Sequence, residues 1–311
     1  MTAIELAQRR TLVADWFRSL QDDICKALET EDGKGKFKED RWERPGGGGG
    51  HTRVLTNGNV IEKGGVNFSA VYGKPPESSV IHAGLDPEKV QEFFATGVSI
   101  VIHPYSPLVP IIHMNVRYFD LGPDKWWVGG GIDLTPHYVK PDDARFFHET
   151  LKSVCDRFNS EFYPSFKKWA DDYFFITHRD ETRGIGGIFF DYLSENEKFT
   201  FDDRFQFVQG VGSSFAGIYV ELMRRNKALP FSPEQKHWQL VRRGRYVEFN
   251  LVYDRGTKFG LESHGRTESI LMSLPPTADW IYDHHPAAGT PEAETLSWLR
   301  KEIDWTSPQL S

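Results

Sequence analysis

The stretch SIVIHPYSPLVPIIHMNVRYF, residues 99–119, consists of two apolar runs joined by a proline-rich turn. Beyond the turn every second residue is apolar, at Ile112, Met114, Val116 and Tyr118. The positions between them hold His113, Asn115 and Arg117, which we call the polar row. Because successive side chains of a strand point to opposite faces, these three groups share one face at intervals of about 6.5–7 Å. A solvent-facing strand would favour Lys, Glu and Thr, so we expect the polar row to form the floor of a cavity.

The segments on either side alternate between helical and strand-like patterns. The 3.6-residue period predicts helices at 4–29, 86–97, 142–175 with a break near Pro164, 202–226, 233–243 and 291–302. The helix at 86–97 has the clearest boundaries, with Asp86 as N-cap, Pro87 at its first position and Gly97 just past its end. Strands are predicted at 64–73, 98–103, 111–119, 125–134, 184–193, 245–256 and 268–275. This order favours the α+β class, with a large, mostly antiparallel β-sheet flanked by α-helices.

No repeat or long polar linker divides the chain, so we expect a single domain over residues 1–311. Residues 1–36 would be an N-terminal helix and connector, and residues 37–311 the main body. The charged and glycine-rich segment EDGKGKFKEDRWERPGGGGG, residues 31–50, is expected to be an exposed connector. Its five glycines allow two interpretations, a flexible linker or an arm that packs against a large ligand.

Composition limits the classes of function. The 39% hydrophobic and 14% aromatic residues can build a large core, and a net charge of −7 argues against a general nucleic-acid binder. Two cysteines, Cys25 and Cys155, are too few for a disulfide scaffold and suit a reducing compartment. No apolar run approaches the roughly 20 residues of a membrane span, and no signal-peptide pattern opens the chain. We therefore expect a cytoplasmic protein without integral membrane association.

A buried guanidinium in the polar row needs a partner, because burying it alone costs several kcal/mol. The partner of Arg117 is either a protein carboxylate, with Asp133 as the candidate, or a carboxylate of a ligand. Asp133 is equally suited to accept hydrogen bonds from ligand N–H groups. A third reading is a polar ladder between strands, one of them carrying Glu248 and Asn250. The residues alone leave these readings open.

Five blocks of the sequence together resemble oxygen-dependent (aerobic) coproporphyrinogen III oxidase, in order from about residue 37 to 276. The most specific motifs are GGGIDLTP at 129–136 and GRTESILMSLPP at 265–276. The other blocks are residues 44–73, 98–119, 167–193 and the start of 246–276. The resemblance implies a homodimer and the oxidative decarboxylation of two propionates of coproporphyrinogen III to vinyl groups, which gives protoporphyrinogen IX for haem. Molecular oxygen would be the co-substrate, and no organic cofactor is implied.

The resemblance also assigns roles to residues. It implies substrate contacts at Ser99, Asn115, Val116, Arg117, His264, Gly265 and Arg266. His113 matches the position of the proposed proton donor of the family, Arg117 would clamp a propionate, and Asp133 would bind the pyrrole N–H groups. His264 departs from the small residue usual there, and His51–Thr52 departs more mildly. The region Tyr246–Pro275 resembles the dimerisation segment of the family.

Two alternatives remain beside this reading. Some members of the family are described with a divalent metal on histidines that match His103, His113, His148 and His178, whose spacing fits no compact ligand motif. We favour a metal-free site. The alternatives are a histidine-ligated metal dioxygenase and a non-catalytic porphyrin-binding protein.

Overall fold

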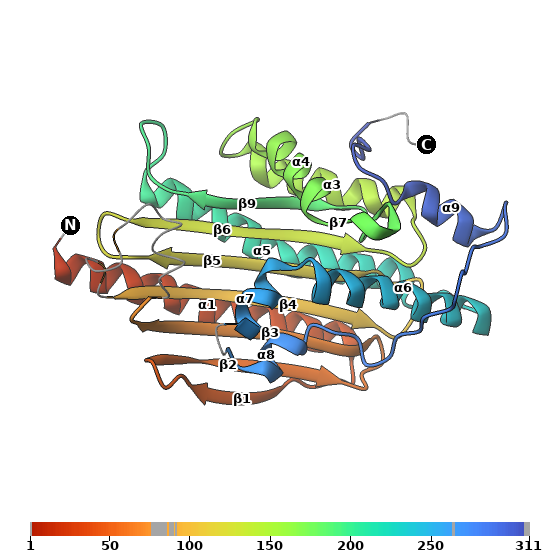
Figure 1. The fold of residues 1–311 in the computed structure, drawn as a ribbon, viewed down its shortest axis with the longest axis horizontal. Helices are drawn as coiled ribbons and strands as arrows, with labels where there is room; N and C mark the ends of the chain where they lie inside the picture. Colours follow the sequence, from red (N-terminus) through yellow and green to blue (C-terminus); the bar gives the residue numbers. More distant parts are fainter. Residues whose placement is uncertain (1, 76–85, 87–89, 91, 263–264, 308–311) are drawn as a thin grey trace.

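One antiparallel sheet of seven strands forms the centre of the computed structural model, which describes residues 2–75, 86, 90, 92–262 and 265–307 (Figure 1). The strands lie in the order β1-β2-β3-β4-β5-β6-β9. Their bounds are β1 Lys38–Glu43, β2 Gly48–Thr56, β3 Ile61–Gly73, β4 Phe93–Pro104, β5 Ile111–Asp120, β6 Trp126–Thr135 and β9 Gly187–Leu193. A separate short pair, β7 Phe175–Ile176 and β8 Glu181–Thr182, flanks the 3₁₀ turn Thr177–Arg179. The predicted α+β class with its mostly antiparallel sheet is confirmed.

Helices cover both faces of this sheet (Figure 1). Behind it lie α1 (Ala3–Asp32) and α5 (Phe201–Asn226), with α3 (Pro141–Asp156) packed on α5 and α4 (Phe162–Tyr173) beside β9. In front lie α6 (Pro233–Val252), α7 (Arg255–Glu262) and α8 (Thr267–Leu271), and α9 (Pro291–Trp298) follows. Thr2, Thr200 and Ser232 start the three longest helices with capping boxes, which satisfy the free N–H groups of the first turn. In the described part of the chain, no helix combines the length and apolarity needed to cross a bilayer.

The alternation that the sequence showed in β5 determines how the sheet packs. Ile112, Met114 and Val116 are fully buried against the α1 and α5 side, together with Val98 and Ile100 of β4. The polar row faces the other way and is half-buried, as a two-residue period requires. The sheet thus separates an apolar core behind it from a polar face in front.

The expected exposed connector is wrong beyond residue 37. Residues Lys38–Glu43 form the edge strand β1, which pairs with β2, and the glycine run contributes the turn and the first residues of β2. Gly47 and Gly48 have φ values of +115° and +79°, a left-handed conformation that side-chain-bearing residues rarely adopt. The glycines therefore serve a tight hairpin turn rather than a flexible linker, and packing of this segment against a large ligand stays a prediction.

The helix predicted at 86–97 is also wrong where it can be judged, because β4 begins at Phe93. Pro87 lies outside the described residues. Pairing with β3 and β5 over the whole length of β4 outweighs the local capping pattern.

The strands predicted at 245–256 and 268–275 are helical instead. Helix α6 continues to Val252, α7 follows at Arg255, and α8 spans Thr267–Leu271. Glu248 and Asn250 therefore lie on a helix, so they are not the strand partners considered for the polar row. The break predicted near Pro164 lies between the end of α3 at Asp156 and the start of α4 at Phe162.

Candidate functional site

The polar row lies in the middle of the sheet, between β4 and β6. Asn115 is opposite Ser99 of β4, His113 is opposite Asp133 of β6, and Arg117 is opposite Gly129. The side chain of His113 is 21% exposed and that of Arg117 is 36% exposed. The row therefore reaches solvent from a face that α6, α7 and α8 cover only in part (Figure 1).

His113 is held by a buried ion pair. Its Nδ1 lies 2.8 Å from Oδ1 of Asp133, which is 1% exposed. Arg183, placed between β8 and β9, donates from Nη2 to both oxygens of Asp133 at 2.7 and 2.8 Å. Burial would raise the pKa of Asp133, but the guanidinium of Arg183 and the contact with His113 lower it below the usual value. Because an ionised carboxylate only accepts hydrogen bonds, Nδ1 of His113 is the donor, and in the neutral imidazole the lone pair then lies on Nε2.

Arg117 has a different carboxylate partner from the one considered in the sequence. Its Nη2 donates to Oδ2 of Asp191 on β9 at 2.7 Å, and its Nη1 donates to Oδ1 of Asn115 at 2.9 Å. Asp133 is therefore not the partner of Arg117. Gly129 makes this pair possible, because a Cβ there would overlap Oδ1 of Asp191 and lie 3.2 Å from Nε of Arg117.

Four aromatic rings from four strands continue the same face beyond Arg117. We call them the aromatic row: Phe93, Phe119, Trp127 and Tyr192. Successive ring centroids lie 5.7, 4.5 and 5.2 Å apart, so the rings form one continuous surface. Tyr192 is 50% exposed and Trp127 is half-buried, so part of this surface is open. The face thus combines an apolar platform with an adjacent guanidinium.

A second group of residues near His113 escaped the sequence reasoning. Phe174 lies edge-on to His113 at 6.2 Å, and Tyr173 stacks on Phe189 of β9 at 4.3 Å. The hydroxyl of Tyr173 donates to Asp254 at 2.8 Å, at the junction of α6 and α7. Arg255 starts α7 with its guanidinium carbon 5.9 Å from the Tyr173 ring. The motif YDRG at residues 253–256 could have pointed to Asp254 and Arg255, but the strand predicted there gave these residues the wrong local structure.

The four histidines considered for a metal do not converge. In the described residues no three His, Cys, Asp or Glu side chains form a group that could hold a metal ion. His103 and His148 are fully buried and contact the carbonyls of Ser273 and Ile185, and burial lowers the pKa of each to about 3. His178 lies near the surface, where its Nε2 contacts Glu248 at 2.8 Å. These four residues do not form one ligand set.

The remaining predicted substrate contacts fall in three places. Ser99 is half-buried next to Asn115 on the polar face. The side chain of Val116 is fully buried on the opposite face, so a ligand on the polar face would meet only the backbone of this residue. Arg266 pairs with Asp40 of β1 and donates to Ser269 at 3.1 Å, while His264 lies outside the described residues. Gly265, next to Arg266 in the sequence, is exposed.

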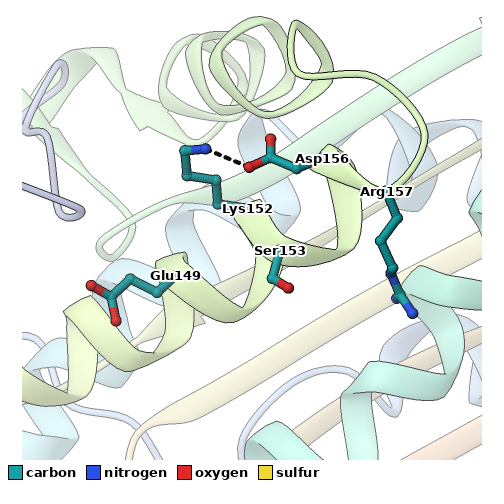
Figure 2. A pocket seen from close by; sticks show the side chains of 5 residues that line it. All are labelled: Glu149, Lys152, Ser153, Asp156 and Arg157. Atoms are coloured by element: carbon teal, nitrogen blue, oxygen red, sulfur yellow. Dashed lines mark hydrogen bonds and ion pairs between the residues drawn. The ribbon is translucent and has the colours of Figure 1, made fainter.

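Two hollows of the described surface lie away from the polar row. One, of about 430 Å³, lies over the outer side of α3 (Figure 2) and is lined by Glu149, Lys152, Ser153, Asp156 and Arg157. Asp156 and Lys152 pair with each other across it. The other, of about 650 Å³, lies between the start of α1 and the end of β5. Neither hollow includes a residue of the polar row, which is a half-buried face in this single chain. The expectation that the row forms the floor of a cavity stays a prediction.

Comparison with models of protein families gives an independent result. The model of the family described as coproporphyrinogen III oxidase matches residues 12–305. The match covers the sheet, the polar row and the helices in front of it.

Proposed function

The chain belongs to the coproporphyrinogen III oxidase family, whose members are oxidoreductases of haem biosynthesis, and we propose that it is the oxygen-dependent enzyme. In this reaction each of two propionates loses carbon dioxide and becomes a vinyl group. The propionate gives up a hydride equivalent, which together with a proton reduces O₂ to hydrogen peroxide. The product is protoporphyrinogen IX.

The observation that carries the proposal is the aromatic row beside Arg117. The substrate is a flexible, largely apolar macrocycle with carboxylates at its rim, so it needs an apolar surface bordered by guanidinium groups. The row of stacked rings supplies that surface, and Arg117 lies at its edge. Arg255 adds a second, exposed guanidinium at the start of α7. Burial and the charge of Asp191 raise the pKa of Tyr192, and both arginines lie close enough to offset part of this increase.

Roles for the polar row follow from its contacts. Arg117 would bind a propionate through the donors that Asp191 and Asn115 leave free, since a guanidinium has five. Ser99 and Asn115 would orient the same end of the substrate. His113, with Nε2 as acceptor, would take or return the proton of a pyrrole N–H while the electron-rich ring reacts with oxygen.

No step of this mechanism is assigned to a metal. The four histidines proposed for it do not fit as a ligand set, because their ring nitrogens contact separate protein groups. The proposal that the reaction uses oxygen and the substrate without an organic cofactor rests on the family resemblance.

The proposal includes a homodimer formed through Tyr246–Pro275. Exposed apolar side chains support it at the end of α6 and on α7, where Leu251, Val252 and Leu261 are 46%, 45% and 40% exposed. A two-fold partner there would also extend the cover over the polar face. A cytoplasmic location remains a prediction from Cys25 and Cys155, which are both free and buried.

The decisive experiment incubates the protein with coproporphyrinogen III under air and under argon, each with and without EDTA. We expect the vinyl product, identified by mass spectrometry, under air in both samples and under argon in neither. Product under argon would contradict oxygen dependence, and loss of product with EDTA would favour the metal dioxygenase. Tight binding of the porphyrinogen without product would favour the carrier.

A further inference from the structure

Arg183 is a buried residue next to the candidate site for which neither the sequence nor the family resemblance gave a role. It is 3% exposed. Besides the two bonds from Nη2, its Nε donates to Oδ2 of Asp133 at 3.3 Å. Together with Nδ1 of His113, this gives the Asp133 carboxylate four hydrogen-bond contacts. A carboxylate so enclosed has little room for a ligand N–H group.

The other side of Arg183 is fixed equally well. Its Nη1 donates to Oδ1 of Asn250 on α6 at 2.9 Å. The guanidinium carbon lies 4.4 Å from the ring of Phe174 and 4.7 Å from those of Tyr246 and Phe249. Three rings and one amide therefore hold the guanidinium in one plane, which is the plane of the fork that meets Asp133.

The geometry points to Arg183 as a positioning residue: it locks the Asp133 carboxylate so that His113 keeps its proton on Nδ1 and presents Nε2 to the substrate. This inference rests on the proposed oxidase function for what His113 does with its lone pair. It changes the expected role of Asp133 from a direct ligand of pyrrole N–H groups to a residue that acts through His113. The arrangement follows the general rule that the group bonded to one imidazole nitrogen sets the state of the other.

A purely structural ion pair would make a different prediction. Buried ion pairs often contribute little net stability, and a structural pair would affect only the amount of folded protein. A positioning pair affects the imidazole itself. The two readings therefore separate in the ring nitrogen signals of His113 and in kcat, with the fold held constant.

The test uses the full chain with ¹⁵N-labelled histidine and the variant Arg183→Lys. An ammonium keeps the charge but does not span both oxygens of Asp133 and Asn250 at once. We expect His113 to change from a pure Nδ1–H tautomer to a mixture, and kcat to fall about tenfold or more while KM stays within twofold. Asn250→Leu removes the hydrogen bond from Nη1 of Arg183 without changing any charge, so it should show the same changes to a smaller degree. This variant replaces Arg183→Lys in the test if the lysine variant does not fold.

Arg204→Lys is the matched control. Arg204 is also a buried arginine, 5% exposed, with its guanidinium carbon 4.2 Å from the ring of Phe199, but its Nε donates to the backbone carbonyl of Ser194 instead of a carboxylate. It should leave the His113 signals and kcat unchanged. Folded Arg183→Lys and Asn250→Leu proteins with an unaltered His113 tautomer would overturn the inference. That readout needs no turnover, so it stays informative if the proposed oxidase activity is absent.

Discussion

Replacing Gly129 with alanine tests whether the Arg117–Asp191 pair organises the site. The added methyl group would overlap Oδ1 of Asp191 and approach Nε of Arg117 to 3.2 Å. Strand β6 is paired with β5 at Gly129 and with β9 at Val128 and Gly130 on either side of it, which limits how far its backbone can move. The two side chains must move instead, and the 2.7 Å contact between them is lost.

The size of the effect follows from that contact. A hydrogen bond between charged groups contributes about 1.5–3 kcal/mol. Arg117 is 36% exposed, so solvent screening favours the lower figure. About 1.5 kcal/mol corresponds to roughly a tenfold loss of kcat/KM. Crowding of a packed position adds a loss of stability of about 1–3 kcal/mol.

Steady-state assays of porphyrinogen turnover and urea denaturation measure the two effects separately. Gly217→Ala is the matched control, because a Cβ at this position in α5 meets nothing within 4 Å. Alanine there should leave turnover unchanged and stabilise the helix by about 0.5–1 kcal/mol. If Gly129→Ala is folded and keeps wild-type kcat/KM, the geometry of Arg117 does not control activity and the proposed clamp is refuted.

Three further outcomes are expected. Arg117→Lys should lower kcat/KM at least tenfold in the same assay, since an ammonium cannot bind a propionate in a fork, whereas Arg41→Lys on the exposed edge of β1 should not. Leu261→Glu should shift a dimer toward monomer in light scattering, because it places a charge on the exposed apolar patch of α7; an unchanged mass would remove this face from the interface. His148→Gln should reduce the acid sensitivity of the fold. Because the pKa of His148 is lowered to about 3, the unfolded chain binds a proton at this residue at higher pH than the folded chain does. This site therefore costs about 1.4 kcal/mol of stability for each pH unit below about 6.5. Urea denaturation at pH 4 to 7 measures this, and the same dependence of the unfolding free energy on pH in the wild type and the variant would contradict it.

The central strands could be predicted because burial and local pattern agree there. In β5 every second residue is buried, so apolar alternation alone predicted the strand and the polar row. Helix α6 shows the opposite case. Its buried positions follow a helical spacing, but they include Arg242, Arg245 and Asn250 beside Tyr246 and Phe249. Because the buried face of α6 contains arginines, the apolar residues alone do not show its helical period. The aromatic residues Tyr246 and Phe249 then led to the prediction of a strand.

The partners in the site could not be predicted, because they depend on contacts between distant segments. Asp191 lies on the predicted strand 184–193, but its position beside Gly129 depends on the β6–β9 register and an irregularity at Val128–Gly130. Arg183 lies on no predicted element, and its role appears only when α4, α6 and β6 meet around it. The sequence pattern predicts which face of a strand a side chain lies on, whereas its partner on another segment is known only from the three-dimensional structure.

The charge distribution of the site explains how a chain of net charge −7 would accept an anionic substrate. Two of the three arginines near His113 are neutralised by protein carboxylates, Arg117 by Asp191 and Arg183 by Asp133. The face is therefore not strongly positive, and long-range attraction cannot provide most of the affinity. On the proposed function, apolar contact with the aromatic row would provide it, while the donors of Arg117 that Asp191 and Asn115 leave free would fix the position of one carboxylate. Such a division suits a substrate whose carboxylates become neutral vinyl groups, because the product keeps the apolar contact and loses the ionic one at the reacted position.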